Sequence, residues 1–357
     1  MAKRRLVIAV AIASAAALLI SGCSSSDDAS AKRACMILPD SESSARWENG
    51  DRPALKEALE AAGFTTDIQN AEGDTAKMLT IGDQMLASGC NVMIITDYQG
   101  AGAQVAAKSK AQGVPTIAYD RPIEGVDYYV SFDNVTVGTL QGEGILKCLA
   151  DAGKDPKTAE LIFLDGDPTD GNAAMFAEGY DTALKAAGVE VDKAKLGAKR
   201  PDGSWDGAKA GTNFEQALTA NGGKVDAVVS ANDTNAASAI AILDKNKLTV
   251  PVSGQDASKE GMNNVLSGKQ CMTVFKDYLV EASTAAELAI AILKGETPTT
   301  NKQLADGTPF QAADPQALYA DAASLEGFKA ALDRSGLTAA DVCTGDAAAK
   351  CTEIGLS

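Results

Sequence analysis

Short apolar runs alternate with helical stretches along most of this chain, and each run ends in a group of polar residues. Residues 92–96 lead into Asp97, and residues 116–119 lead into Asp120 and Arg121. Apolar strands that alternate with helices predict a mainly parallel sheet covered by helices. Ligands bind at the carboxyl ends of the strands of such sheets, so these polar groups should converge on one crevice.

The pattern predicts more strands than one sheet comfortably holds. We expect strands at 35–38, 66–69, 92–96, 116–119, 128–132, 160–164, 189–191, 227–230, 252–253 and 272–275. We expect helices between them, including 135–152, and a further helix at 322–335. In the helix at 280–293, a stripe of Val280, Thr284, Leu288 and Ile292 should face the core.

We therefore predict an α/β fold of two Rossmann-like three-layer domains joined by several chain crossings. The first lobe comprises residues 34–134 plus about 278–310, and the second comprises 135–277 plus about 311–357. No long Pro/Gly/Ser linker separates the halves, which favours several short crossings.

The N-terminus predicts export. Lys3, Arg4 and Arg5 precede an apolar run at 6–20, which has the length of a signal-peptide core. The run ends in Ser-Gly-Cys23 and resembles a bacterial lipobox, so residues 1–22 should be a lipoprotein signal peptide and Cys23 the lipidated residue. The polar stretch at 23–33 then reads as a flexible tether. The alternatives are an ordinary secretory signal or a membrane anchor.

Composition excludes several functions. The chain has 357 residues and a formal net charge of −16, which disfavours nucleic acid or an anionic lipid surface as a partner. It contains no histidine, which excludes a Ser-His-Asp triad and, with no Cys-x-x-Cys present, weakens any zinc or redox-motif interpretation. We expect no cofactor and no metal.

Apart from Cys23, the cysteines are six in number, which outside the cytoplasm favours disulfides with 15 possible connectivities. Element positions favour one pairing as a hypothesis. Cys343 and Cys351 would close a short loop, while Cys35 and Cys90 start or precede strands that could be neighbours. Cys148 would then pair with Cys271.

Both tryptophans, Trp47 and Trp205, lie in predicted loops. They could be packing residues or platforms for the C–H face of a sugar, and Arg46 beside Trp47 could donate to hydroxyl groups. Asp120 and Arg121 could form a structural ion pair, or could hold one hydroxyl between an acceptor and donors.

Other strand-end residues also have two interpretations. Asn172 and Asn232 could cap helices or face a ligand, with Asp233 as the alternative to Asn232. Asp256 could be a turn former and Lys276 a surface charge. Carboxylate pairs make a glycosidase conceivable, but nothing marks a pair with a raised pKa.

Taken together, segments such as Ala118–Arg121, Tyr129–Asn134, Asp226–Asp233 and Ser253–Ala257 resemble bacterial periplasmic sugar-binding proteins of the type I, ribose-like class. The resemblance covers roughly residues 34–293 and is greatest to the D-xylose-binding proteins of ABC transporters. It implies that the sugar contacts are Arg46, Trp47, Asp120, Arg121, Asn172, Trp205, Asn232, Asp256 and Lys276. The loop at 39–45 lacks the basic residue expected ahead of Arg46, and the segment from Thr297 hardly matches.

The resemblance implies a solute-binding lipoprotein on the outer face of the cytoplasmic membrane. It would be a monomer that closes on a monosaccharide, D-xylose or a similar aldopyranose, and presents the closed form to an ABC permease. It would not be an enzyme. The alternatives are a sensor that presents its closed form to a receptor or kinase and, more remotely, a sugar-active enzyme.

Overall fold

The structure is a computed structural model that describes residues 32–41, 43–44 and 46–356. Its larger sheet has seven strands in the order β2-β1-β3-β4-β5-β10-β9, and only the β9–β10 pair is antiparallel. The strands are β1 (Arg33–Leu38), β2 (Thr65–Asn70), β3 (Val92–Ile95), β4 (Thr116–Tyr119), β5 (Tyr128–Phe132), β9 (Lys302–Gln303) and β10 (Pro309–Ala313). The predicted α/β class with mainly parallel strands is confirmed.

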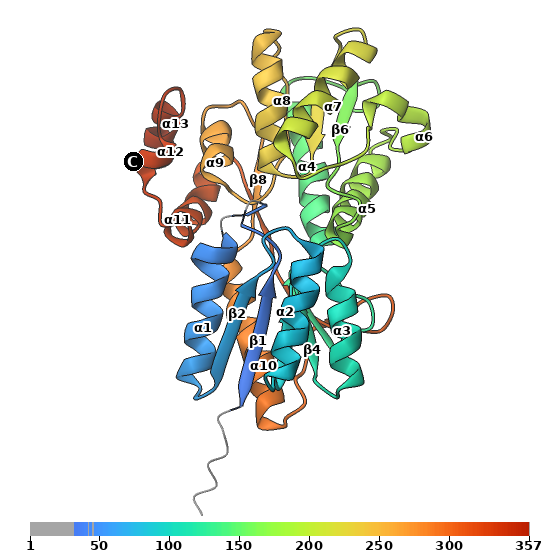
Figure 1. The fold of residues 1–357 in the computed structure, drawn as a ribbon. Helices are drawn as coiled ribbons and strands as arrows, with labels where there is room; N and C mark the ends of the chain where they lie inside the picture. Colours follow the sequence, from blue (N-terminus) through green and yellow to red (C-terminus); the bar gives the residue numbers. More distant parts are fainter. Residues whose placement is uncertain (1–31, 42, 45, 357) are drawn as a thin grey trace, which may run out of the picture. The chain divides into compact units, whose positions relative to one another are not determined.

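Helices cover both faces of this sheet (Figure 1). The helices α1 (Arg52–Ala61) and α10 (Tyr278–Lys294) pack on one face, and α2 (Thr75–Ala87) and α3 (Ala101–Ala111) pack on the other. A short π-helical turn, η1 (Trp47–Asp51), leads directly into α1. Strands β3 and β4, at the centre of the sheet, are buried along their whole length. Both of their faces therefore carry mainly apolar side chains, which gives continuous hydrophobic runs in the sequence.

The remaining strands form two short sheets. Strand β6 (Leu161–Leu164) pairs with β7 (Ala227–Ser230) in parallel, and β8 (Thr273–Phe275) pairs with β11 (Gln316–Leu318) in antiparallel orientation. Isolated bridges Val228–Val252 and Gln255–Val274 connect these sheets through the segment between them.

Helices also enclose the two short sheets (Figure 1). The cluster on one face includes α4 (Asn134–Asp151) and α5 (Gly171–Ala186), and the cluster on the other includes α7 (Gly207–Ala220) and α8 (Asp233–Lys245). The connecting elements are α6 (Lys193–Leu196), η2 (Gly197–Lys199) and α9 (Lys259–Leu266). The C-terminal elements η3 (Ala322–Ser324), α11 (Leu325–Arg334), α12 (Ala339–Val342) and α13 (Ala347–Ile354) pack with α9 around Met262 and Phe328.

Close packing of α4 on α5 fixes the start of α5. A Cβ at Gly138 would lie 2.0 Å from the carbonyl oxygen of Phe176, and one at Gly179 would lie 2.2 Å from that of Val135. Only glycine allows the two backbones to approach this closely. At the same end of the pair, the Nδ2 of Asn134 donates to the Oδ1 of Asn172 over 2.9 Å.

Two local predictions are wrong. Residues 189–191 form no strand, because Val189 and Val191 pack into a helix-sheet cluster and the carbonyl of Val191 accepts a bond from Arg200 over 2.7 Å. Val280 is 48% exposed, whereas Glu281 is fully buried, so the buried face of α10 is rotated from the predicted stripe. Strands β9, β10 and β11 were not predicted.

The chain moves between the larger sheet and the short sheets three times, after β5, after β8 and after β10. Strand pairing assigns each strand to a sheet, and the predicted domain limits remain a prediction. The three predicted disulfides, Cys35–Cys90, Cys148–Cys271 and Cys343–Cys351, are all present. Among the residues that the structure describes, no helix is both long enough and apolar enough to cross a membrane.

Candidate functional site

One cavity collects all of the predicted sugar contacts. Its volume is about 60 Å³, and its wall contains Arg46, Trp47, Asp120, Arg121, Asn172, Trp205, Asn232, Asp256 and Lys276. These residues come from η1 and the residue before it, the end of β4, the starts of α5 and α8, and the segments before α7, before α9 and after β8. A second cavity of about 540 Å³ shares Ser43, Arg121, Asp170 and Trp205 with the first, so the two adjoin.

Arg46 lies at the centre of a buried charge cluster. Its guanidinium donates to both carboxylate oxygens of Asp51 over 2.8 Å, to Asp120 over 3.2 Å and to Glu281. The side chains of Asp51 and Glu281 are both fully buried. The two parallel bonds to Asp51 are a bidentate guanidinium–carboxylate interaction, which fixes the orientation of the Arg46 side chain.

One cation faces three carboxyl groups in this cluster, so the negative charges cannot all be balanced. Burial raises the pKa of Glu281 to about 8, against the opposing effect of Arg46. The pKa of Arg46 is raised well above its ordinary value, because the attraction of Asp51 and Glu281 outweighs the effect of burial. The cluster therefore keeps Arg46 charged and Glu281 protonated at neutral pH.

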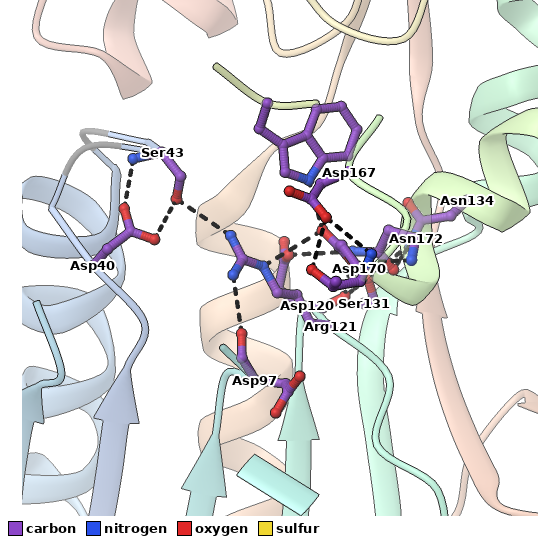
Figure 2. Close-up of polar contacts among 12 residues, drawn as sticks. Asp40, Ser43, Asp97, Asp120, Arg121, Ser131, Asn134, Asp167, Asp170 and Asn172 are labelled. Carbon is purple, nitrogen blue, oxygen red and sulfur yellow. Dashed lines mark hydrogen bonds and ion pairs between the residues drawn. The ribbon is translucent and has the colours of Figure 1, made fainter. Parts of the chain in front are cut away.

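Asp120 occupies a backbone conformation that few residues adopt. Its φ is +62°, in the left-handed region, where Asp and Asn are tolerated better than most side chains. Its carbonyl accepts bonds from the hydroxyls of Tyr129 and Ser131 and from the Nδ2 of Asn172, each over 2.9 Å. These donors hold the strained turn in place and tie the end of β4 to the start of α5, as Figure 2 shows.

The structure corrects the idea that Asp120 and Arg121 pair with each other. Asp120 pairs with Arg46, whereas Arg121 lies 3.5 Å from Asp170. Arg121 also donates to the carbonyl of Asp97 over 2.9 Å and to the Oγ of Ser43 over 3.2 Å (Figure 2). Arg121 therefore links the ends of β3 and β4 to the start of α5.

The two tryptophans differ in their surroundings. Trp47 is 3% exposed and packs in the hydrophobic cluster beneath the larger sheet, while its Nε1 donates to Ser43 over 3.1 Å. The guanidinium carbon of Arg46 lies 4.6 Å from the Trp47 ring centroid, a cation–π contact. Trp47 is therefore a packing residue that also lines the cavity, and its contact with a sugar stays a prediction.

Trp205 is partly buried and is held by three neighbours. Its ring meets Phe176 edge-on at 6.3 Å between centroids, and its Nε1 donates to Asp170 over 3.2 Å. A Cβ at Gly166 would lie 2.0 Å from the Trp205 ring, so only glycine leaves room for it. The indole is thus fixed before any ligand arrives.

Asn232 and Asp233 divide the roles left open in the sequence. Asn232 caps α8 by accepting from the backbone N–H of Asn235 over 2.9 Å and also lines the cavity. Asp233 lies behind it, 2% exposed, and accepts from Gln270 over 2.8 Å and Thr273 over 2.9 Å. Burial, with a smaller contribution from Asp256, raises the pKa of Asp233 to about 7.

Asp256 and Lys276 form a charge pair on the cavity wall. The Nζ of Lys276 lies 3.3 Å from the Oδ1 of Asp256, and the Asp256 side chain is 43% exposed. Asp256 has a φ of +98°, so a second strained aspartate, like Asp120, lines the cavity. The Nζ of Lys276 also lies 5.8 Å from the Phe132 ring and 5.7 Å from the Phe176 ring.

Several residues at the site were not predicted. Asp170 and Gln255 line the cavity, and Asp51 and Glu281 hold Arg46 from behind. Asp170 caps α5 through the N–H of Asn172, so its place two residues before Asn172 is a sequence signal for it. Glu281 lies 235 positions from Arg46 in the chain and offers no such signal.

Within the described residues, no group of three or more His, Cys, Asp or Glu side chains is arranged to hold a metal ion. The predicted lipidation residue Cys23 lies outside the described residues.

Comparison with known proteins decides the family. Residues 35–297 match the periplasmic binding protein domain family. The chain belongs to this family. This membership and the similarity to solved structures confirm the type I binding-protein fold. The family consists of sugar-binding transport proteins, which confirms the prediction that the chain is not an enzyme.

Two sequence relatives and one solved structure are similar to the chain over most of its length. The chain is 33% identical to the D-xylose-binding periplasmic protein of Escherichia coli K12, over 73% of this chain and 78% of the relative. It is 34% identical to a multiple sugar-binding periplasmic protein of Azospirillum brasilense, over 76% of this chain and 80% of the relative. An ABC transporter solute-binding protein of Clostridium phytofermentans, solved with bound β-D-glucose, has a TM-score of 0.72 and 30% identity, with 85% of this chain and 98% of that one covered.

Proposed function

We propose that this protein is the solute-binding component of a sugar ABC importer. It binds a monosaccharide, D-xylose or a similar aldopyranose, in the cavity that contains Arg46 and Trp205. The observation that carries the proposal is that polar residues from the larger sheet and from the part built on the two short sheets line one cavity beside two indole rings. The names of the relatives, which refer to D-xylose, to multiple sugars and to bound glucose, support a sugar as the ligand class.

The chemistry of the wall suits a ligand with many hydroxyl groups. Asp120 and Asp256 accept hydrogen bonds, Arg46, Arg121 and Lys276 donate them, and each sugar hydroxyl can do both. Bonds to charged partners are the stronger ones, and the pairs Arg46–Asp120 and Lys276–Asp256 balance their charges without an ionic ligand. The indole of Trp205 offers an apolar face for the C–H groups of a pyranose ring.

Binding would be coupled to closure. Arg46, Trp47, Asp120 and Arg121 follow strands of the larger sheet, whereas Asn172, Trp205, Asn232 and Asp256 belong to the part built on the short sheets. A ligand that bonds to both groups stabilises the state in which they are close together. A micromolar dissociation constant would correspond to about −8 kcal/mol.

The cavity volumes bear on ligand size. Ligand pockets commonly measure about 300–1,000 Å³. The cavity that contains the predicted sugar contacts, called the inner cavity below, measures about 60 Å³ and is far smaller than this. The sugar would therefore extend toward the adjoining cavity of about 540 Å³. Ser43, Arg121, Asp170 and Trp205 lie where the two meet.

A thermal-shift screen of the mature protein against D-xylose, D-glucose, D-galactose, L-arabinose and D-ribose tests the proposal. An aldopyranose should raise the melting temperature, and the shift should shrink in Trp205→Ala and Asp256→Ala. Asp202→Ala is the matched control, because the Asp202 side chain is 89% exposed and pairs with Lys193 on the surface. If no monosaccharide raises the melting temperature, the proposed ligand class is wrong. Normal binding by the two cavity variants would instead refute the proposed site.

We further propose that Cys23 carries a lipid that holds the protein on the outer face of the cytoplasmic membrane, beside its permease. The support is the sequence alone, in which an apolar run ends in Ser-Gly-Cys. Cells that express Cys23→Ala should lose fatty-acid labelling of the protein and release it into the soluble fraction. Labelling that persists in the variant would refute the assignment.

A further inference from the structure

The wall of the inner cavity contains a largely buried glutamine, Gln255, whose amide oxygen has no hydrogen-bond partner. Gln255 is 4% exposed, lines the cavity, and its Oε1 makes no hydrogen bond. Its Nε2 is not one of the fully buried unpartnered atoms, and it makes no hydrogen bond within the described part of the chain. We propose that Gln255 is a sugar-contacting residue that sets specificity by requiring a hydroxyl group at its position. The inference rests on the proposed sugar-binding function.

The backbone around Gln255 is fixed, so the amide is held in the wall. Its carbonyl accepts the N–H of Asp233 over 3.0 Å, and the residue forms a parallel bridge with Val274. The backbone N–H of the next residue, Asp256, bonds to Val274 over 2.8 Å. Because these backbone hydrogen bonds hold Gln255 in place, its backbone is not free to shift and expose the side chain to water.

Other buried amides with an unsatisfied oxygen keep at least one bond through their nitrogen. Gln141 donates to the carbonyl of Ser230 over 3.1 Å, Gln270 to Asp233 over 2.8 Å, and Asn235 to Ser204 over 2.9 Å. Gln255 differs because its amide nitrogen makes no such bond and because the side chain lines the cavity. A buried polar group without a partner destabilises the fold, so it calls for a functional explanation.

The chemistry of the amide indicates what it would recognise. The carboxylates of the cavity can only accept hydrogen bonds, and its arginine and lysine side chains can only donate them. A glutamine does both from one plane, which matches two neighbouring hydroxyl groups of a sugar, one donating and one accepting. A sugar that lacks one of these hydroxyls would leave the amide buried and unpaired, and sites of this kind reject such analogues strongly.

Gln255→Met provides the test, because methionine has a similar length and no polar amide. The variant should bind D-xylose and D-glucose at least about tenfold more weakly, as expected for the loss of buried hydrogen bonds to a ligand. Its melting temperature without sugar should equal or exceed that of the wild type, since an unpaired buried group has been removed. A merely structural glutamine would lower the melting temperature and leave specificity unchanged.

Asn264→Leu is the matched control, because Asn264 also has an unpartnered buried amide nitrogen but does not line the cavity. This variant should keep wild-type affinity. The 2-, 3- and 4-deoxy-D-glucoses then locate the contact, since Gln255→Met should lose discrimination against one of them. An equal loss of affinity for all analogues, or wild-type affinity in Gln255→Met, would overturn the inference. In the second case Trp205→Ala should still lose binding, so the proposed function would stand.

Discussion

Replacing Arg46 with methionine should destabilise the fold far more than a surface charge would. Among the described residues, Arg46 is the one cation paired with Asp51 and Glu281, two side chains that are both fully buried. Breaking a buried ion pair by removing one partner costs roughly 3–5 kcal/mol, because the remaining charge lies buried and unpaired. Glu281 is already protonated at neutral pH and adds no charge, but among the described residues the carboxylate of Asp51 would keep the bond from Tyr119 alone.

Urea denaturation at pH 7, followed by circular dichroism, measures the loss for Arg46→Met. Arg52→Met is the control, since Arg52 pairs with Glu48 where the side chains are 29% and 34% exposed. A partly exposed pair contributes about 1 kcal/mol or less. Adding Asp51→Asn to the Arg46→Met variant should recover about 1 kcal/mol or more, because it removes the uncompensated buried carboxylate. Equal losses for the two arginine variants would refute the account of the buried cluster.

Three further predictions concern the site and its support. Glu281→Gln should flatten the pH dependence of the melting temperature. In the folded state Glu281 keeps its proton up to a pKa of about 8, whereas in the unfolded chain it releases the proton near pH 4.5. Wild-type stability should therefore fall as the pH rises from 4.5 to 8. Plots of melting temperature against pH that run parallel for the variant and the wild type would contradict this. Gly166→Ala should weaken sugar binding about tenfold or more in titration calorimetry, because the new Cβ would lie 2.0 Å from the Trp205 ring; unchanged affinity would show that the ring position is irrelevant. Asp256→Gly and Asp256→Ala should both bind sugar about tenfold more weakly. Both lose the pair with Lys276, but the glycine variant should be the more stable, since glycine adopts a φ of +98° without strain; equal melting temperatures would count against that reasoning.

The strand-end residues could be predicted because the alternation of strands and helices fixes where each strand ends. Asp120 follows an apolar run directly and Asp256 comes four residues after Val252, and parallel pairing then brings such strand ends to one edge. The disulfide Cys35–Cys90 could be inferred in the same way, since β1 pairs with β3 and Cys90 precedes β3.

Residues that act from behind the site could not be predicted in this way. Glu281 lies on α10, where the spacing of apolar residues predicted that Val280 faces the core. In the structure Val280 is exposed and its neighbour Glu281 is buried. Its partner Arg46 is remote in the sequence, so only the folded chain brings the two together. The pairing of Asp120 with Arg46 rather than with Arg121 likewise depends on side-chain directions that a linear pattern does not contain.

Short edge strands were missed for a different reason. Strand β9 has two residues and β11 has three, too few to establish an alternating pattern. Strand β10 shows alternate burial, but no helix follows it to complete a strand-helix unit. The run at 189–191 had the composition of a strand and no neighbouring strand to pair with, so tertiary packing determined its conformation.

Titration calorimetry of the mature protein with aldopyranoses tests the central claim most directly. The account predicts that one sugar binds per chain with a micromolar dissociation constant, and that Trp205→Ala loses most of this affinity while Asp202→Ala keeps it. If none of D-xylose, D-glucose, D-galactose and L-arabinose binds, or if binding is the same in Trp205→Ala as in the wild type, the assignment of this cavity as a sugar site is contradicted.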